Sequence, residues 1–228
     1  MSSNQGIFDR LKDIILDALY PPRCAICDAL LPVGARHFHA ECAAGLVFAE
    51  QYEDGGTALL EYNAASRDMI HNFKYGGNTP AASAIASLID RGGDVASRIT
   101  GYDMIVPVPL HAARLRERGF NQSELLARAM EPICGVPVVA ALSRVRDTKK
   151  QSLVARQLRR PNIAGAFVAE AGLVRAKRVL LVDDITTTGG TFAECEEALR
   201  SAGAEEVGSF AVCVAGKRDA VRRTVSRQ

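Results

Sequence analysis

The 228-residue sequence has no long apolar run and little net charge. None of its apolar stretches approaches the roughly 18 residues that a membrane-spanning helix needs. The first residues, MSSNQGIFDRLKD, lack the uninterrupted apolar core of a signal peptide. These absences predict a cytoplasmic protein without membrane insertion. The formal net charge of +2, from 28 basic and 26 acidic residues, is too small to indicate nucleic-acid binding by bulk electrostatics. A nucleic-acid site would therefore need a local cluster of basic residues.

The residues that are present, 48% hydrophobic and 24% charged, are typical of a globular protein and exclude a disordered or fibrous one. Residues 7–20 have the period of an amphipathic helix. Residues 23–56 show little periodic pattern but hold three of the six cysteines, and residues 50–56 are polar and glycine-containing, as in a linker. The sequence therefore predicts two units: residues 1–56, a helix with a small module, and residues 57–228.

The second unit alternates predicted strands with predicted helices. This alternation predicts an α/β domain with a mainly parallel sheet flanked by helices. Residues 143–162 form a basic stretch that is either a mobile functional loop or a hairpin. The expected strands lie at 104–108, 136–139, 179–182 and 207–214, and the expected helices near 79–91, 120–131 and 191–202.

The most informative segment is VLLVDDITTTGGT, residues 179–191, followed by a helical run. A buried strand ends in two carboxylates, and a Thr/Gly turn then leads into a helix N-terminus. Glycines allow the backbone to approach a phosphate, while hydroxyls and free helix amides donate to its oxygens. The segment predicts a site for a phosphorylated sugar, and its candidate residues are Asp183, Asp184, Thr186, Thr187, Thr188, Gly189, Gly190 and Thr191.

The two carboxylates do not suit the phosphate itself. We expect them at an exposed strand end, accepting hydrogen bonds from ribose hydroxyls or stabilising a cationic centre and a nearby Mg²⁺. The alternative is an acidic pair at the sheet edge of another doubly wound protein, followed by a turn that is rich in threonine by chance.

Two basic segments accompany this turn. Arg114 and Arg118 lie one helical turn apart after a predicted strand, either facing the ligand crevice or forming a solvated face with Glu117. Residues 144–160 carry seven basic side chains against one acidic side chain. That stretch could close over a bound ligand or follow a nucleic-acid backbone, although it lacks the aromatic residues that stack on single-stranded bases.

The cysteines of the first unit have metal-ligand spacing. Cys24 and Cys27 form C-x-x-C, and His39 and Cys42 repeat the spacing as H-x-x-C. Two such pairs close a four-ligand structural zinc site, which has no open position for catalysis. His37 is a rival ligand for His39. The alternative is a reduced, metal-free module with buried thiols.

Residues 179–191 resemble the phosphoribosyl pyrophosphate (PRPP) signature of type I phosphoribosyltransferases. Residues 102–127, YDMIVPVPLHAARLRERGFNQSELLA, residues 144–167, FKYG at 73–76 and the cysteine module extend the resemblance to the ComF/GntX family of competence-related proteins. That family usually has C-x-x-C in both pairs and a glycine after the second cysteine. Here His39 replaces a cysteine and Asp28 stands in place of the glycine.

The resemblance implies a type I phosphoribosyltransferase-like domain that binds PRPP with Mg²⁺, with Arg114 and Arg118 on the pyrophosphate. It also implies a role in natural transformation, in the handling of incoming single-stranded DNA with helicase-like competence proteins. The resemblance does not indicate which acceptor would receive the ribose. Two alternatives are therefore a PRPP- or DNA-binding interaction protein without turnover, and a zinc-ribbon nucleic-acid module with a vestigial transferase domain.

Overall fold

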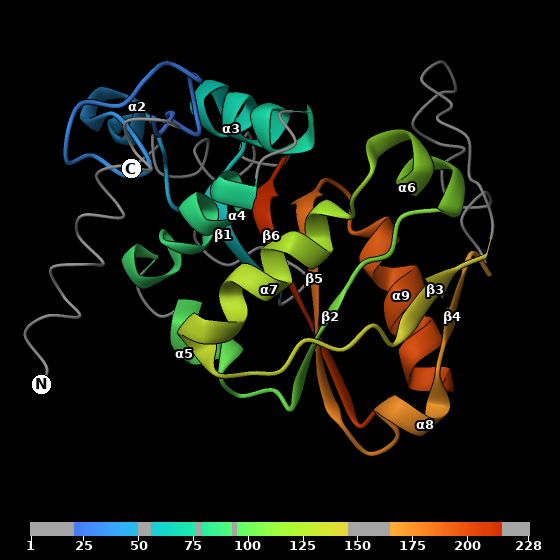
Figure 1. Cartoon of the computed structure of the whole chain (residues 1–228). Coiled ribbons are helices and arrows are strands. Elements are labelled where there is room, and N and C mark those ends of the chain that lie inside the picture. Colours follow the sequence, from blue (N-terminus) through green and yellow to red (C-terminus); the bar gives the residue numbers. More distant parts are fainter. Residues whose placement is uncertain (1–20, 50–55, 76–78, 93–94, 146–164, 216–228) are drawn as a thin grey trace, which may run out of the picture.

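The computed structural model describes residues 21–49, 56–75, 79–92, 95–145 and 165–215 (Figure 1). The predicted helix at 7–20, most of the predicted linker and the basic residues 146–164 lie outside the described residues. None of the described helices is long and apolar enough to cross a membrane.

A four-stranded parallel sheet forms the centre of the domain. Its order is β1–β6–β5–β2, and the central strands β5 and β6 pair over their full length. Val138 adds a parallel bridge to Ile105 beyond β2, and β3 and β4 form a separate antiparallel pair. The strands are β1 (Thr57–Glu61), β2 (Met104–Pro107), β3 (Leu142–Arg144), β4 (Phe167–Ala169), β5 (Arg178–Thr186) and β6 (Glu206–Val214).

Helices cover both faces of this sheet, as expected when every strand connection is a crossover. Alternate residues of β5 point to opposite faces: Leu180 and Val182 enter one apolar core with α3, α4, α5 and α7, whereas Val179 and Leu181 enter another with α9 and β4. The helices are α2 (Ala40–Ala44), α3 (Ala64–Tyr75), α4 (Thr79–Ala86), α5 (Val95–Ile99), α6 (Ala112–Arg118), α7 (Gln122–Cys134), α8 (Ala171–Val174) and α9 (Gly190–Ser201), with a 3₁₀ turn at Ile89–Arg91.

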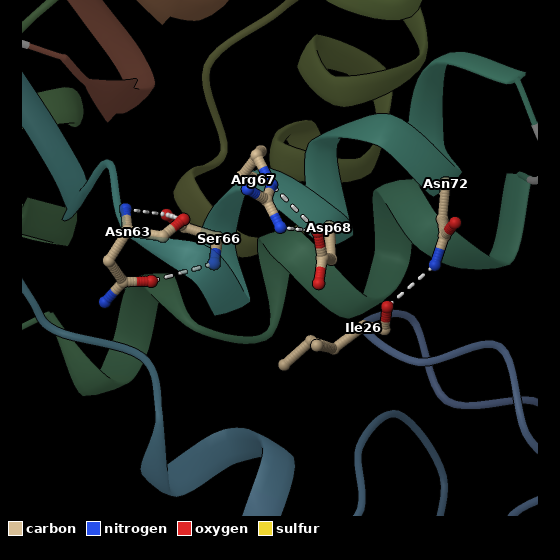
Figure 2. Close-up of polar contacts among 6 residues, drawn as sticks. All are labelled: Ile26, Asn63, Ser66, Arg67, Asp68 and Asn72. Carbon is tan, nitrogen blue, oxygen red and sulfur yellow. Dashed lines mark hydrogen bonds and ion pairs between the residues drawn. The ribbon is translucent and has the colours of Figure 1, made fainter.

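The cysteine-bearing segment packs against this domain. Cys24, Ile26 and Leu31 belong to the same apolar core as α3, and Asn72 of α3 donates a hydrogen bond of 2.8 Å to the Ile26 carbonyl (Figure 2). Phe48 forms an antiparallel bridge to Leu60 at the outer edge of β1. The segment therefore shares core and sheet edge with the α/β domain.

Three predicted elements differ from the observed ones. The helix expected at 79–91 ends at Ala86 and is followed by the separate 3₁₀ turn. The strand expected at 136–139 is reduced to backbone bonds around Val138, with Ile105 N–H donating to the Pro137 carbonyl and Val139 N–H to the Ile105 carbonyl. The strand expected to end at Val182 continues to Thr186, because pairing with β6 extends through the polar residues. Periodicity does not reveal this pairing.

Candidate functional site

The Thr/Gly turn joins the carboxyl end of β5 to the N-terminus of α9. Thr186 is buried in the strand, Thr187 and Thr188 are exposed in the turn, and Thr191 lies in the first helical turn. Gly189 has φ of 70°, a left-handed conformation that glycine adopts without a Cβ penalty, and it caps α9. The turn thus presents hydroxyl groups and free helix amides at one edge of the sheet.

Asp183 is held by the start of α7. Its Oδ1 accepts hydrogen bonds of 2.8 Å from the Ser123 hydroxyl and 2.8 Å from the Asp184 amide. Burial and the neighbouring charge of Asp184 raise the pKa of Asp183 from 3.8 to about 7, although these two hydrogen bonds and Lys74 act in the opposite direction. The pKa of this carboxyl group therefore lies near neutral pH.

Asp184 lies on the other face of β5, where Lys74 of α3 contacts it. The Lys74 Nζ atom lies 2.8 Å from Asp184 Oδ2, and the two side chains are 21% and 3% exposed. The contact is an ion pair, and Asp184 Oδ2 has no other polar partner among the residues that the structure describes. The expectation that both carboxylates are readily solvated is wrong for Asp184, because α3 covers this end of the strand.

The two arginines of α6 stand at the same edge of the sheet, since β2 and β5 run parallel (Figure 1). Arg114 and Arg118 are both partly buried. Arg118 Nη1 donates to Gln122 Oε1 at 2.6 Å, and its guanidinium lies 5.6 Å from the ring centroid of Tyr75, at the end of α3. His111 caps α6, because its Nδ1 accepts a hydrogen bond of 3.3 Å from the Ala113 amide.

A second cluster joins the four predicted metal ligands. The ligand atoms of Cys24, Cys27, His39 and Cys42 all lie within 4.8 Å of one another. His39 Nδ1 lies 3.3 Å from Cys27 Sγ, while its Nε2 donates to the Leu30 carbonyl at 3.0 Å and so leaves Nδ1 free to coordinate. His37 is not among the four. Three sulfur atoms and one nitrogen atom, on a ring oriented by its bond to the Leu30 carbonyl, fit a tetrahedral zinc ion.

The thiols differ in acidity. Burial acts to raise the pKa of Cys24, but hydrogen bonds from backbone groups at Cys27, His39 and Ile26 lower it to about 7. Burial and the adjacent thiols raise the pKa of Cys42 to about 12. The Cys24 thiol is therefore readily ionised, and a bound cation would favour the ionised form of the Cys42 thiol as well.

Asp28, in the turn of the first pair, has φ of 57°. This is the position where the resembled family has glycine, the residue that adopts such a φ most easily. Arg23 Nη1 donates to the Asp28 carbonyl at 2.7 Å, and the Asp28 amide donates to the Cys24 carbonyl, so the turn closes despite the Cβ.

Two residues of the site, Lys74 and Ser123, were missed as ligand-site residues by sequence reasoning. Ser123 is 60 positions from Asp183, and Lys74 is in a different helix altogether. Lys74 stood in the FKYG segment that supported the family resemblance, and this was the one available signal.

The carboxyl edge of this parallel sheet, with its acidic pair and Thr/Gly turn, is typical of phosphoribosyltransferases, and the family model of the phosphoribosyl transferase domain matches residues 113–226. Relatives include the DNA utilization protein YhgH of Escherichia coli, 32% identical over 183 residues that cover 78% of this chain and 80% of that protein. Competence protein ComFC of Streptococcus pneumoniae is 30% identical over 155 residues, 68% of this chain and 66% of that protein. The chain belongs to the ComF family of phosphoribosyltransferase-like proteins.

Among solved structures, the adenine phosphoribosyltransferase of Saccharomyces cerevisiae aligns with a TM-score of 0.41 and 16% identity, over 76% of this chain and 86% of that one.

Proposed function

We propose that the chain binds PRPP with Mg²⁺ at the carboxyl edge of the sheet. The observation that carries this proposal is the acidic pair, which lies directly before a Thr/Gly turn at a helix N-terminus, with the arginines of α6 at the same edge. Hydroxyls of the turn and amides of α9 would hold the 5-phosphate. Asp183 and Asp184 would accept from the ribose hydroxyls, and Arg114 and Arg118 would contact the pyrophosphate.

Asp183 has an oxygen atom available for one of these contacts. Both hydrogen bonds that Asp183 forms with the described residues go to Oδ1, so Oδ2 remains for a ribose hydroxyl or for hydrated Mg²⁺. When bound, Mg²⁺ neutralises charge on the pyrophosphate oxygens. In a transfer reaction, the bond from ribose C1 to the pyrophosphate oxygen breaks with its electron pair on the pyrophosphate. The lone pair of an acceptor then forms the new bond to C1, while the carboxylates stabilise the positive charge that develops on the sugar.

Calorimetric titration with PRPP in the presence of Mg²⁺ tests this proposal. We expect saturable binding, with weaker binding of ribose 5-phosphate because it lacks the pyrophosphate. A folded protein that binds neither compound would refute the proposal. Release of pyrophosphate when candidate nucleobases are supplied distinguishes an enzyme from a protein that only binds PRPP.

The names of the relatives support a role in DNA uptake, and we propose that the chain contacts single-stranded DNA during this process. Any binding should be through phosphates, with little sequence preference and a steep loss of affinity as salt rises. Electrophoretic mobility shifts of random-sequence oligonucleotides at 50 and 200 mM salt, as chosen test conditions, measure this dependence. Binding that is strongly sequence-specific or independent of salt would contradict it.

A further inference from the structure

Lys74 is held at the acidic pair by the way α3 is fixed at both ends. At its start, Asn63 and Ser66 form a capping box: the Asn63 amide donates to Ser66 Oγ at 2.8 Å and the Ser66 amide to Asn63 Oδ1 at 3.0 Å (Figure 2). Near its end, Asn72 bonds to the Ile26 carbonyl, and Phe73 is fully buried. The backbone that carries Lys74 therefore has little freedom to move away from β5.

The ammonium group of Lys74 meets a carboxylate that water barely reaches. Its Nζ lies 2.8 Å from Asp184 Oδ2, and the Asp184 side chain is 3% exposed. A buried carboxylate without a cation costs several kcal/mol or takes up a proton. The neighbouring Asp183 adds a second carboxylate to the same end of the strand, which increases the need for a positive charge.

We propose that Lys74 is a positioning residue of the PRPP site: its ammonium group fixes the orientation of Asp184 and places a positive charge beside the acidic pair. This inference rests on the proposed function. Lys74 acts through Asp184, and the ribose hydroxyls meet the carboxylates rather than the lysine.

Besides Ser123 of α7, titratable groups of the described residues face the pair from three elements. Lys74 faces it from α3, Cys213 from β6 and Cys195 from α9. Burial raises the pKa of Cys213 to about 12 and raises that of Cys195 further, so both thiols are neutral across the physiological range. Lys74 thus supplies the positive charge against the two carboxylates, and its presence lowers the pKa of Asp183. Without it, Asp183 would hold its proton to higher pH and lose its charge-assisted bond to a ribose hydroxyl.

The test uses full-length Lys74→Met and Lys74→Arg variants, with Lys177→Met as a matched control. Lys177 is exposed and directly precedes β5, at the end of the strand opposite Asp184. The first measurement is the pH titration of ¹³C-labelled aspartate carboxyl groups by NMR, with the Asp183 signal assigned from its absence in Asp183→Asn. The second is PRPP affinity by calorimetry between about pH 6 and pH 9, a range that spans the titration of the pair.

We expect Lys74→Met to raise the apparent pKa of Asp183, because the positive charge of Lys74 lowers it. A rise of one unit from neutral leaves about a tenth rather than about half of the carboxyl ionised at pH 7. A rise of that size would lower PRPP affinity about fivefold at pH 7, and the affinity should recover toward pH 9. Lys74→Arg should keep most of the affinity, and Lys177→Met should change neither measurement.

The inference is overturned if the apparent pKa of Asp183 in folded Lys74→Met is the same as in the wild type. It is also overturned if the loss of PRPP affinity is the same at every pH. If Lys74→Met does not fold, Lys74→Gln, which offers the carboxylate an uncharged donor, is measured in the same way against the same expectation. If the wild-type protein does not bind PRPP, the proposed function fails. The NMR titration still decides whether Lys74 controls the charge of the pair.

Discussion

At the scale of single residues, Asp183 and Asp184 differ in what surrounds their carboxylates. Asp184 has an ammonium group at 2.8 Å, so Asp184→Asn leaves the partly buried Lys74 without its partner. We expect this variant to lose about 1–3 kcal/mol in free energy of unfolding. Asp183→Asn should be neutral or stabilising at pH 8, since Asn still accepts from Ser123 and no longer repels Asp184. Thermal denaturation of both variants measures the difference, and equal destabilisation would contradict it.

The raised pKa of Asp183 also predicts a dependence of stability on pH. Between pH 3.8 and about 7, the folded state holds a proton on Asp183 that the unfolded state has released. The contribution of this group to stability therefore falls as pH rises through that window, by at most about 1.4 kcal/mol per pH unit, and is level above it. Asp183→Asn should remove this slope from urea denaturation curves recorded across the window. A wild-type slope that persists in the variant would place the responsible group elsewhere.

Asp28 adopts a left-handed backbone conformation despite its Cβ. Asp28→Gly should relieve strain of about 1 kcal/mol and lose only an exposed ion pair to Arg23, of 3.6 Å, which contributes little. We expect a higher melting temperature and unchanged or tighter zinc binding. Asp28→Ala, which keeps the Cβ but removes the ion pair, is the matched control and should not stabilise. A lower melting temperature for Asp28→Gly would show that the carboxylate matters more than the backbone.

At the scale of elements, Gly189 and Gly190 at the start of α9 have different roles. Gly189 has φ of 70°, so Gly189→Ala should destabilise folding by about 1 kcal/mol. The Cβ of Gly190→Ala would meet only Thr188 Oγ1 at 3.7 Å, an ordinary contact, and alanine favours the helix. This variant should therefore fold as well as the wild type and still bind PRPP more weakly, because the new methyl group stands where a phosphate would approach the amides. Unchanged affinity in calorimetry would move the phosphate site away from this turn.

Sequence patterns predicted best those elements in which one hydrophobic pattern continues along the whole element. The apolar run at 179–182 correctly indicated a central parallel strand, and the prediction of a parallel sheet flanked by helices is confirmed. β1 and the start of α3 were not predicted, because Thr57–Glu61 is only five residues long and its burial depends on pairing with β6.

For the site, local spacing indicated the acidic pair, the turn and the four metal ligands. It could not indicate Lys74 or Ser123, because each reaches its aspartate through tertiary packing across long stretches of sequence. It also could not show that α3 buries Asp184. The assignment of Asp183, Asp184, Arg114, Arg118 and the turn to PRPP stays a prediction.

At the scale of the whole molecule, the cluster of Cys24, Cys27, His39 and Cys42 is continuous with the main core. Cys24 is 1% exposed and lies in the same core as α3 and α7. We expect about one zinc per chain by metal analysis. Removal by a chelator, or Cys24→Ser with Cys27→Ser, should lower the melting temperature of the entire domain. Cys134→Ser, outside the cluster, is the control. Protein purified without chelator that contains no zinc would refute the metal site.

Helix α3 touches both sites within three residues of its sequence. Asn72 holds the Ile26 carbonyl, between Cys24 and Cys27, and Lys74 holds Asp184. We expect a ligand that shifts or stiffens this helix at one place to affect the other, and such coupling is reciprocal at equilibrium. By whatever factor zinc changes the affinity for PRPP, PRPP must change the affinity for zinc by the same factor. If zinc strengthens PRPP binding, a cell short of zinc would bind PRPP more weakly, and abundant PRPP would strengthen the hold on the metal.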